Sequence, residues 1–291
     1  MNLAVERTKY IVSVVLYGTI GMFLRYVSIP SEIVAMCRGA LGSVFILLYL
    51  RMRRKHLDRF AIRENLKWLV IAGVSLGLNW IFLFASYMQT TVAIASLCNY
   101  MAPIIVILIA PVVLKEQLDK RKMPYVVTAF VGIILVSGVW NGSVGSISGV
   151  VMALVAAICF VIIIICNRKI HDIPALYKSV IQLAISAVTI LPYVLVRNWG
   201  ATLEWDMQSI LIILMLGMIH TGVAYCLYFS GMGSLPVQTV AILGYLEPVV
   251  SVLCSAFFLH EAMGVAGWIG AVLIIGAAIM SEIQPTQKQK E

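Results

Sequence analysis

The chain has 291 residues, of which 62% are hydrophobic and only 12% are charged, and its formal net charge is +8. A soluble domain is about 45–50% apolar and about a quarter charged, so a water-soluble fold of this length could not bury so much apolar side chain. The composition therefore excludes a soluble protein. The basic excess is more typical of the cytoplasmic loops of a membrane protein than of nucleic-acid binding.

Ten apolar runs follow one another along the chain, and a helix of about 20 such residues crosses a bilayer. The runs cover residues 8–26, 31–50, 67–87, 91–113, 123–139, 147–167, 175–196, 209–230, 236–259 and 263–282. The first run lacks a small-residue cleavage site, so we expect a retained helix rather than a signal peptide. The pattern predicts an all-α membrane protein with ten transmembrane helices.

The basic residues predict how these helices are oriented. With the N-terminus in the cytoplasm, eighteen of the twenty-one lysines and arginines fall on the cytoplasmic side. Arg25 and Arg197 then lie outside, and Arg38 lies within the membrane. Because cytoplasmic loops are enriched in lysine and arginine, we expect both termini in the cytoplasm and the loop 140–146 outside.

A shift of 145 residues lays 77–116 on 222–261 without a gap, and eight of forty positions are identical. The identical pairs are Gly77/Gly222, Phe84/Phe229, Val92/Val237, Tyr100/Tyr245, Pro103/Pro248, Leu108/Leu253, Leu114/Leu259 and Glu116/Glu261. The same shift lays the first five predicted helices on the last five. An odd number of helices inserts the second copy upside down, which predicts inverted repeats over 1–145 and 146–291 around a central cavity.

Two segments carry a family resemblance. "NYMAPIIVILIAPVVLKEQL" and "GYLEPVVSVLCSAFFLHEAMGVAGWIGAVLIIGAAIM" resemble the paired signatures of the drug/metabolite transporter (DMT) superfamily, EamA-type group, and "CRGALG" in the second run agrees. The resemblance implies ten helices in two inverted halves around a cavity. It also implies transport of amino acids, their derivatives, vitamins or other small metabolites, often outward. One departure is Ala102, which stands where the second repeat has Glu247.

Several polar residues fall near the middle of different predicted helices. Polar groups at that depth do not face lipid, so they must meet one another or a wet cavity. Arg38 lies somewhat outward of the midplane. The candidate substrate- or proton-binding residues are Glu247, Arg38, His220, Asn79, Trp80, Asn99, Tyr100, Tyr225 and Tyr245.

Two prolines mark the expected cavity wall. Pro103 and Pro248 each leave unbonded the carbonyl four residues earlier, on Asn99 and Gly244. Irregular backbone at membrane depth persists only where protein or water covers it. We therefore expect both prolines to break their helices at the cavity, where aromatic neighbours could stack on an organic substrate.

Structural roles for the same residues stay open. Glu247 is either a cavity residue or a partner that neutralises Arg38 or His220, and Arg38 is either a site residue or half of an ion pair that locks two helices. His220 fits a buried packing position as well as a site. Glu116 and Glu261 fit a capping role.

These observations predict a secondary transporter, an exporter of small polar or amphipathic metabolites such as amino acids or their derivatives. It would work by alternating access in the plasma membrane, the inner membrane of a bacterium. We expect no enzyme activity, no cofactor or metal and no nucleic-acid partner. Protons are a candidate coupling ion, and the protein is either a monomer or a homodimer.

Two rival functions remain. One is an intramembrane serine hydrolase that pairs Ser75 with His220, and the other is a non-transporting scaffold or receptor. Ser75 lies in "GVSLG" (73–77), which formally matches a nucleophile elbow. Because this motif falls inside a membrane helix, its small residues more often indicate close helix packing.

Overall fold

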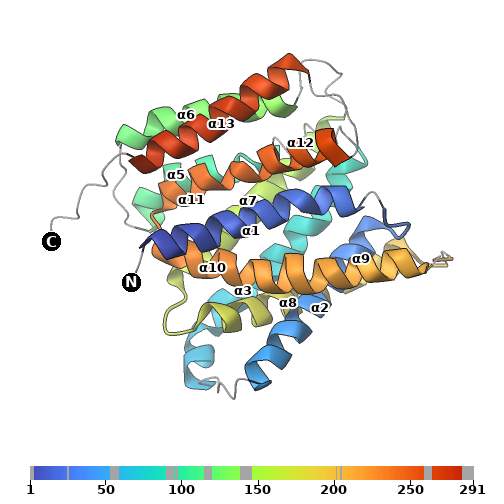
Figure 1. The fold of residues 1–291 in the computed structure, drawn as a ribbon. Coiled ribbons are helices and arrows are strands. Elements are labelled where there is room, and N and C mark those ends of the chain that lie inside the picture. The colour runs from blue at the N-terminus through green and yellow to red at the C-terminus, as the bar shows by residue number, and fades with distance from the viewer. Residues whose placement is uncertain are drawn as a thin grey trace.

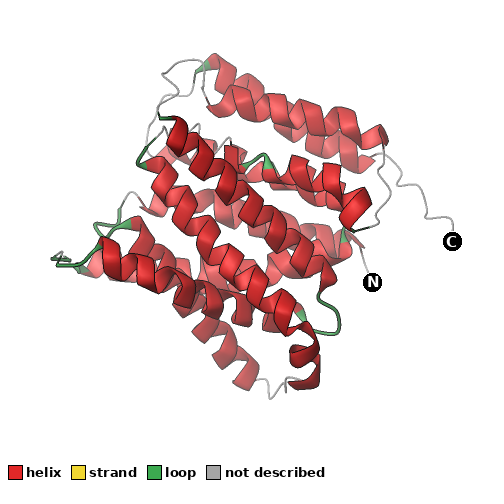
Figure 2. Ribbon diagram, turned by 180° about the vertical axis from the view of Figure 1, so that it is seen from behind, coloured by secondary structure: helices red, strands yellow, loops and turns green. Residues whose placement is uncertain are grey.

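The computed structural model describes residues 3–24, 26–52, 59–89, 95, 98–114, 120–137, 146–200, 202–203, 205–258 and 264–283. Every regular element in these ranges is helical (Figure 2). The elements are α1 Leu3–Leu24, α2 Ser31–Met52, α3 Arg59–Tyr87, α5 Ala102–Val113, η1 Lys120–Lys122, α6 Met123–Ser137, α7 Ile147–Lys169, α8 Ala175–Arg197, α9 Met207–Gly217, η3 Met218–Val223, α10 Ala224–Ser234, α11 Val237–Gly244, α12 Leu246–Phe258 and α13 Val265–Ile283.

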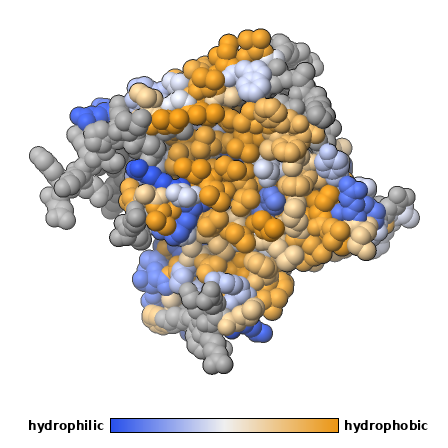
Figure 3. Space-filling view, viewed as in Figure 1, coloured by the Kyte–Doolittle hydropathy of each residue, from blue (hydrophilic) through white to orange (hydrophobic). Residues whose placement is uncertain are grey.

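Five of the described helical segments are long and apolar enough to cross a membrane. They are Ser31–Met52, Phe60–Ser86, Ile147–Lys169, Ala175–Arg197 and Met207–Ser234, and shorter apolar helices accompany them. Large apolar side chains are exposed on the outer faces of these helices, among them Leu48, Val188 and Val272. Figure 3 shows a mostly hydrophobic surface between hydrophilic regions at opposite edges of the molecule. Such a surface is suited to lipid rather than water.

The helices form one bundle whose packing pairs elements that are distant in the sequence. α3 packs against α7 and α8, α1 against α10 and α12, and α2 against α8, α9 and η3. α5 contacts α7 and α11, while α6 and α13 lie side by side at one edge of the bundle (Figure 1). α1 begins and α13 ends at the same end of the bundle.

Glycines let these helices approach closely. A Cβ at Gly73 would lie 2.6 Å from Cβ of Ile185, and one at Gly77 would lie 2.8 Å from Cβ of Thr189. Both contacts join α3 to α8. The small residues of "GVSLG" therefore pack helices together, as the sequence indicated.

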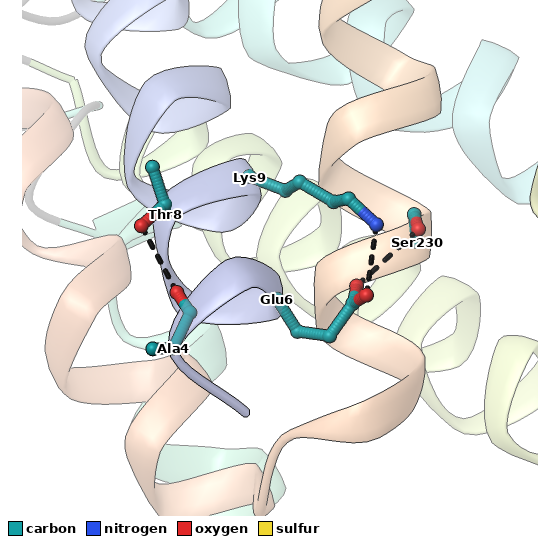
Figure 4. A network of polar contacts seen from close by, with 5 residues as sticks. All are labelled: Ala4, Glu6, Thr8, Lys9 and Ser230. Atoms are coloured by element: carbon teal, nitrogen blue, oxygen red, sulfur yellow. Dashed lines mark hydrogen bonds and ion pairs between the residues drawn. The ribbon is translucent and has the colours of Figure 1, made fainter. Parts of the chain in front are cut away.

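A polar network ties the start of α1 to α10 (Figure 4). Glu6 is only 7% exposed, and Lys9 donates to its carboxylate at 2.8 Å. The hydroxyl of Ser230 donates to the other carboxylate oxygen at 3.4 Å. The carboxylate is thus buried with a charge partner on its own helix and a hydroxyl partner across the contact.

The observed helices differ from the predicted runs in several places, one of which is the turn at 100–101 that interrupts the predicted helix 91–113 before α5. α3 begins at Arg59, eight residues before the predicted run, because an apolar run marks only the part of a helix that lies in hydrocarbon. The predicted helix 236–259 is divided at Tyr245 into α11 and α12. The predicted helix 209–230 is continuous from 207 to 234 but contains the π-helical segment η3.

Both prolines of the repeat lie in the first turn of a helix. Pro103 is the second residue of α5, and Pro248 is the third residue of α12. The first N–H groups of a helix have no intrahelical acceptor, so proline costs little there. The chain therefore starts a new helix just before each proline. Arg25, Glu116, Glu261 and 138–145 lie outside the described residues.

Candidate functional site

A cavity of about 420 Å³ lies in the bundle and is bordered by α1, α2, α3, α5, α7, α10, α11 and α12. Most of its wall is apolar or aromatic, and a few polar groups face it, as is common for small-molecule sites. The predicted site residues that border it are Arg38, Asn79, Trp80, Asn99, Tyr100, Tyr225 and Glu247. Residues from distant parts of the sequence thus meet in one space.

Arg38 reaches the cavity from α2. The side chain is only 7% exposed, its Nε donates to Oγ1 of Thr221 at 3.1 Å, and its guanidinium carbon lies 5.4 Å from the centroid of the Trp80 ring. Neither neighbour carries a negative charge. The guanidinium is therefore oriented by a hydroxyl and an aromatic face, and its charge is not cancelled by contact.

Glu247 reaches the same cavity from the first turn of α12 and is partly buried. Tyr100 lies within hydrogen-bonding reach of its carboxylate. The N-terminal end of a helix favours a negative charge, which helps to hold the carboxylate at this depth. Arg38 and Glu247, both described residues, form no direct ion pair. Their opposite charges remain available to a molecule between them.

Asn79 links α3 to its neighbours beside the cavity. Its Nδ2 donates to the Ala156 carbonyl on α7 at 2.8 Å and to Oδ1 of Asn99 at 3.3 Å. The Ala156 bond holds the amide in a fixed orientation, because a buried amide N–H needs an acceptor. Asn99 lies at the helix interruption before α5 and contributes a second amide to the wall.

Aromatic rings from α1, α3 and α10 form a continuous wall. The Tyr17 ring centroid lies 5.7 Å from those of both Tyr225 and Tyr228, and the Trp80 centroid lies 6.5 Å from that of Tyr225. Tyr10 packs on Tyr228 at 5.0 Å and donates its hydroxyl to the Val240 carbonyl at 3.0 Å. Two of these contacts, Tyr17–Tyr225 and Trp80–Tyr225, are edge-to-face, one of the arrangements that aromatic pairs prefer. The wall is therefore preformed.

Two cavity residues of α1, Tyr10 and Tyr17, were missed by the sequence analysis. They belong to a helix face with Val14, Gly21 and Leu24, all of which border the cavity. The spacing of four, three, four and three residues is the helical repeat of one face, and that pattern was present in the sequence.

Arg168 was also missed as a cavity residue. The sequence analysis counted it among the cytoplasmic cations, but it lies in the last turn of α7 and borders the cavity. Its Nη2 donates to the Leu235 carbonyl, at the junction between α10 and α11. Counting lysines and arginines predicts on which side of the membrane a loop lies. It does not predict whether a long side chain such as that of Arg168 points to solvent or to the cavity.

Two predicted residues, Tyr245 and Pro248, are placed away from the cavity lining. Tyr245 is fully buried in an apolar cluster with Ala129, Ile133 and Ile274, on the side of α6 and α13. Pro248 is buried but does not border the cavity, and Pro103 is described only by its backbone. The depth predicted from the sequence was similar for these residues and for those that border the cavity, so predicted depth alone does not separate the two groups.

His220 is buried in η3 and does not border the cavity. Its Nε2 lies 2.9 Å from Oγ1 of Thr19, whose hydroxyl also lies close to the Leu16 carbonyl. The tautomer of the ring decides whether Nε2 or Oγ1 donates. The structure forms no hydrogen bond between His220 and Ser75, two residues that it describes, so the hydrolase pair is not assembled.

The cavity has the composition of a small-molecule site, and comparison with known proteins decides the family. The EamA-like transporter family matches the chain twice, over residues 9–138 and 147–282. The chain belongs to this family. It is a multi-pass membrane transporter of the DMT superfamily, as the two signature segments indicated.

Individual relatives agree with the family. One relative, "Uncharacterized transporter YxxF" of Bacillus subtilis, is 25% identical over 95% of this chain and 89% of its own length. A probable amino-acid metabolite efflux pump of Salmonella typhimurium is 29% identical over 56% of this chain and 58% of its own length. A solved crystal structure with 18% identity superposes with a TM-score of 0.82 over 95% of this chain and 96% of that one, so the two share a fold.

Proposed function

We propose that this EamA-family protein exports small amphipathic metabolites, amino acids or their derivatives, by alternating access between two inverted five-helix halves. The observation that carries the proposal is the cavity, where Arg38 and Glu247 face one space without pairing with each other. A solute with both polar and apolar parts finds a cation, an acid and an aromatic wall there. Outward transport is supported by the efflux pump among the relatives.

The packing of the helices supports the two inverted halves. If α1 corresponds to α7 and α3 to the continuous helix α9–η3–α10, the contact of α3 with α7 has its mate in that of α1 with α10. The contact of α5 with α7 likewise mirrors that of α12 with α1. The contacts of α2 with α8 and of α6 with α13 map onto themselves. This is the pattern that a twofold relation between the halves produces.

The cavity wall supports the same relation. Several residues and their equivalents 145 positions later both border the cavity. The pairs are Gly18/Ile163, Trp80/Tyr225, Leu83/Tyr228, Phe84/Phe229, Asn99/Gly244 and Val106/Ser251. We infer that the substrate site lies on the pseudo-twofold axis.

Charge breaks this symmetry. The equivalents of Arg38 and Glu247 are Leu183 and Ala102, which are both apolar. The two halves therefore supply a similar aromatic frame and different chemistry. In an alternating-access cycle, this asymmetry would orient a solute with unlike ends along one direction.

A two-step experiment tests the function. The purified full chain is first screened by thermal shift against amino acids, amino-acid amides, vitamins and quaternary amines, because a ligand stabilises the state that it binds. Liposomes preloaded with the best ligand are then tested for uptake of the labelled compound. We expect saturable exchange that protein-free liposomes lack. A screen without stabilisation, together with no exchange of any compound, would contradict the proposal.

For the topology, we expect both termini in the cytoplasm, with the loop 140–146 outside the cell. The lysine and arginine asymmetry supports this orientation, and α1 and α13 begin and end at the same end of the bundle. In a cysteine-free variant, Gly142→Cys should react with a membrane-impermeant maleimide added to whole cells. Protection in whole cells and labelling in inside-out vesicles would reverse the orientation.

A further inference from the structure

Thr221 has a hydroxyl whose hydrogen bonds fix its direction. The hydroxyl donates its single proton to the Leu216 carbonyl at 2.8 Å. Its oxygen lone pairs then face Nε of Arg38 at 3.1 Å. Because a hydroxyl has only one proton, this oxygen can act toward Arg38 only as an acceptor. Thr221 is fully buried, so water does not compete for either bond.

The π-helical segment makes this arrangement possible. In a regular α-helix a threonine hydroxyl bonds the carbonyl three or four residues earlier, whereas Thr221 bonds the one five residues earlier. The wider turn of η3 thus directs Thr221 toward α2 and the adjacent His220 toward α1. Single π-helical turns inside α-helices often mark functional positions.

A glycine on α2 allows the contact. A Cβ at Gly42 would lie 2.9 Å from Cγ2 of Thr221 and 3.2 Å from the Gly217 carbonyl oxygen. Gly42 follows Arg38 by four residues, so the two occupy the same face of α2. Arg38 and Gly42, the arginine and the last glycine of "CRGALG", therefore both contact η3. Arg38 does so through its side chain, and Gly42 allows the close approach because it has no side chain.

The remaining donors of Arg38 face the cavity. Thr221 occupies Nε, Trp80 covers the guanidinium at 5.4 Å, and none of the described residues accepts a hydrogen bond from Nη1 or Nη2. Two parallel N–H groups at the end of a guanidinium match the two oxygens of a carboxylate. A guanidinium held on one edge and one face loses little freedom when it binds.

We propose that Thr221 is a positioning residue that sets Arg38 as a bidentate site for the carboxylate of the transported solute. This inference rests on the proposed function and adds a chemical requirement to it, because a solute without a carboxylate would lack the contact. The rest of such a solute would lie along the aromatic wall toward Glu247. A neutral carboxamide of the same shape offers only one acceptor oxygen and no charge.

Matched acids and amides test the carboxylate site. The probes are L-leucine with L-leucinamide and L-phenylalanine with L-phenylalaninamide, and the measurement is the dissociation constant for the purified full chain. We expect the wild-type protein to bind each acid at least about tenfold more tightly than its amide. Thr221→Val keeps the shape and removes the acceptor, and it should weaken binding of the acids about tenfold while changing that of the amides little.

Two further variants separate positioning from folding. Thr221→Ser keeps the hydroxyl and should restore the acid–amide difference. Thr19→Val removes a threonine hydroxyl on the other side of η3, and it should leave the difference unchanged. Equal binding of acid and amide by the wild-type protein would overturn the carboxylate site, whether or not the valine variant folds. An unchanged difference in Thr221→Val, or an equal loss for acids and amides, would overturn the positioning role.

The outcomes also separate this inference from the proposed function. If leucine and its amide bind equally and both are transported, the protein is still a metabolite transporter and only the carboxylate site is wrong. If none of the metabolites of the wider screen binds or is exchanged, the proposed function fails and the inference fails with it.

Discussion

Replacing Arg38 by leucine is expected to abolish transport while leaving the protein folded. The side chain is nearly buried, borders the cavity and makes no ion pair with Glu247. Where removal of one charge unfolds a protein, the usual reason is that it leaves a buried opposite charge without its direct partner. Arg38→Leu does not do this, because Arg38 has no such partner among the described residues. On insertion scales, arginine at the centre of a membrane helix costs about 2.5–3.5 kcal/mol, and leucine does not carry this cost.

The measurement compares exchange in liposomes with the melting temperature of the purified variant. Transport should fall to the level of protein-free liposomes, while the melting temperature should change by only a few degrees, on the scale of about 1 kcal/mol. Arg38→Lys keeps the charge without the planar fork and should retain only weak transport. Arg197→Leu, at the exposed end of α8, serves as the matched control and should transport normally. Full transport by Arg38→Leu would show that the charge is dispensable.

The helices were the most predictable part of the molecule. The length of the apolar runs located many of the observed helices within a few residues, because the thickness of the hydrocarbon layer sets the length of a membrane-spanning helix. The helix interruptions before Pro103 and Pro248 could also be anticipated, since proline removes a backbone hydrogen bond from a helix interior, although Pro111 and Pro192 lie inside α5 and α8. The π-helical turn η3 could not be located. Nothing in "MIHTGV" distinguishes it from a regular helix, and the contacts of His220 and Thr221 with two other helices accompany it.

The cavity was only partly predictable, for a geometric reason. Counting residues gives the depth of a side chain, but each residue also turns the helix by about 100°, and an apolar sequence carries little information on that angle. Tyr100 and Tyr245 show the consequence. They are equivalent in the repeat, lie at similar predicted depth and both pack in the apolar cluster beside α6 and α13, yet of the two residues Tyr100 alone also borders the cavity.

Glu247 connects the cavity to a helix contact. A Cβ at Gly18 would lie 2.6 Å from the Glu247 carbonyl oxygen, so α1 packs directly on the backbone of this residue. The Glu247 side chain faces the cavity from the same turn. A change in the charge or ligand of the carboxylate therefore acts next to the packing of α1 on α12. If these two helices move during alternating access, Glu247 is placed to link binding to that movement.

Glu247→Gln is expected to separate two roles for this carboxylate. The substitution keeps size and hydrogen bonding but removes both charge and titration. If Glu247 carries a coupling proton, the variant should still exchange substrate across liposomes but lose accumulation driven by a pH gradient. If Glu247 holds the ammonium group of the solute, binding itself should fall, and more for cationic than for neutral solutes, because a charge-assisted hydrogen bond is lost.

Three measurements on one preparation distinguish these results: the dissociation constant, the exchange rate at equal pH and the accumulation ratio under an imposed pH gradient. Glu6→Gln is the matched control, because Glu6 is a buried carboxylate outside the cavity that is paired with Lys9. That variant should keep the wild-type accumulation ratio even if its melting temperature falls, since it alters the contact between α1 and α10 and not the site. Wild-type binding, exchange and accumulation in Glu247→Gln would exclude both roles, and the carboxylate would then serve only the packing of the bundle.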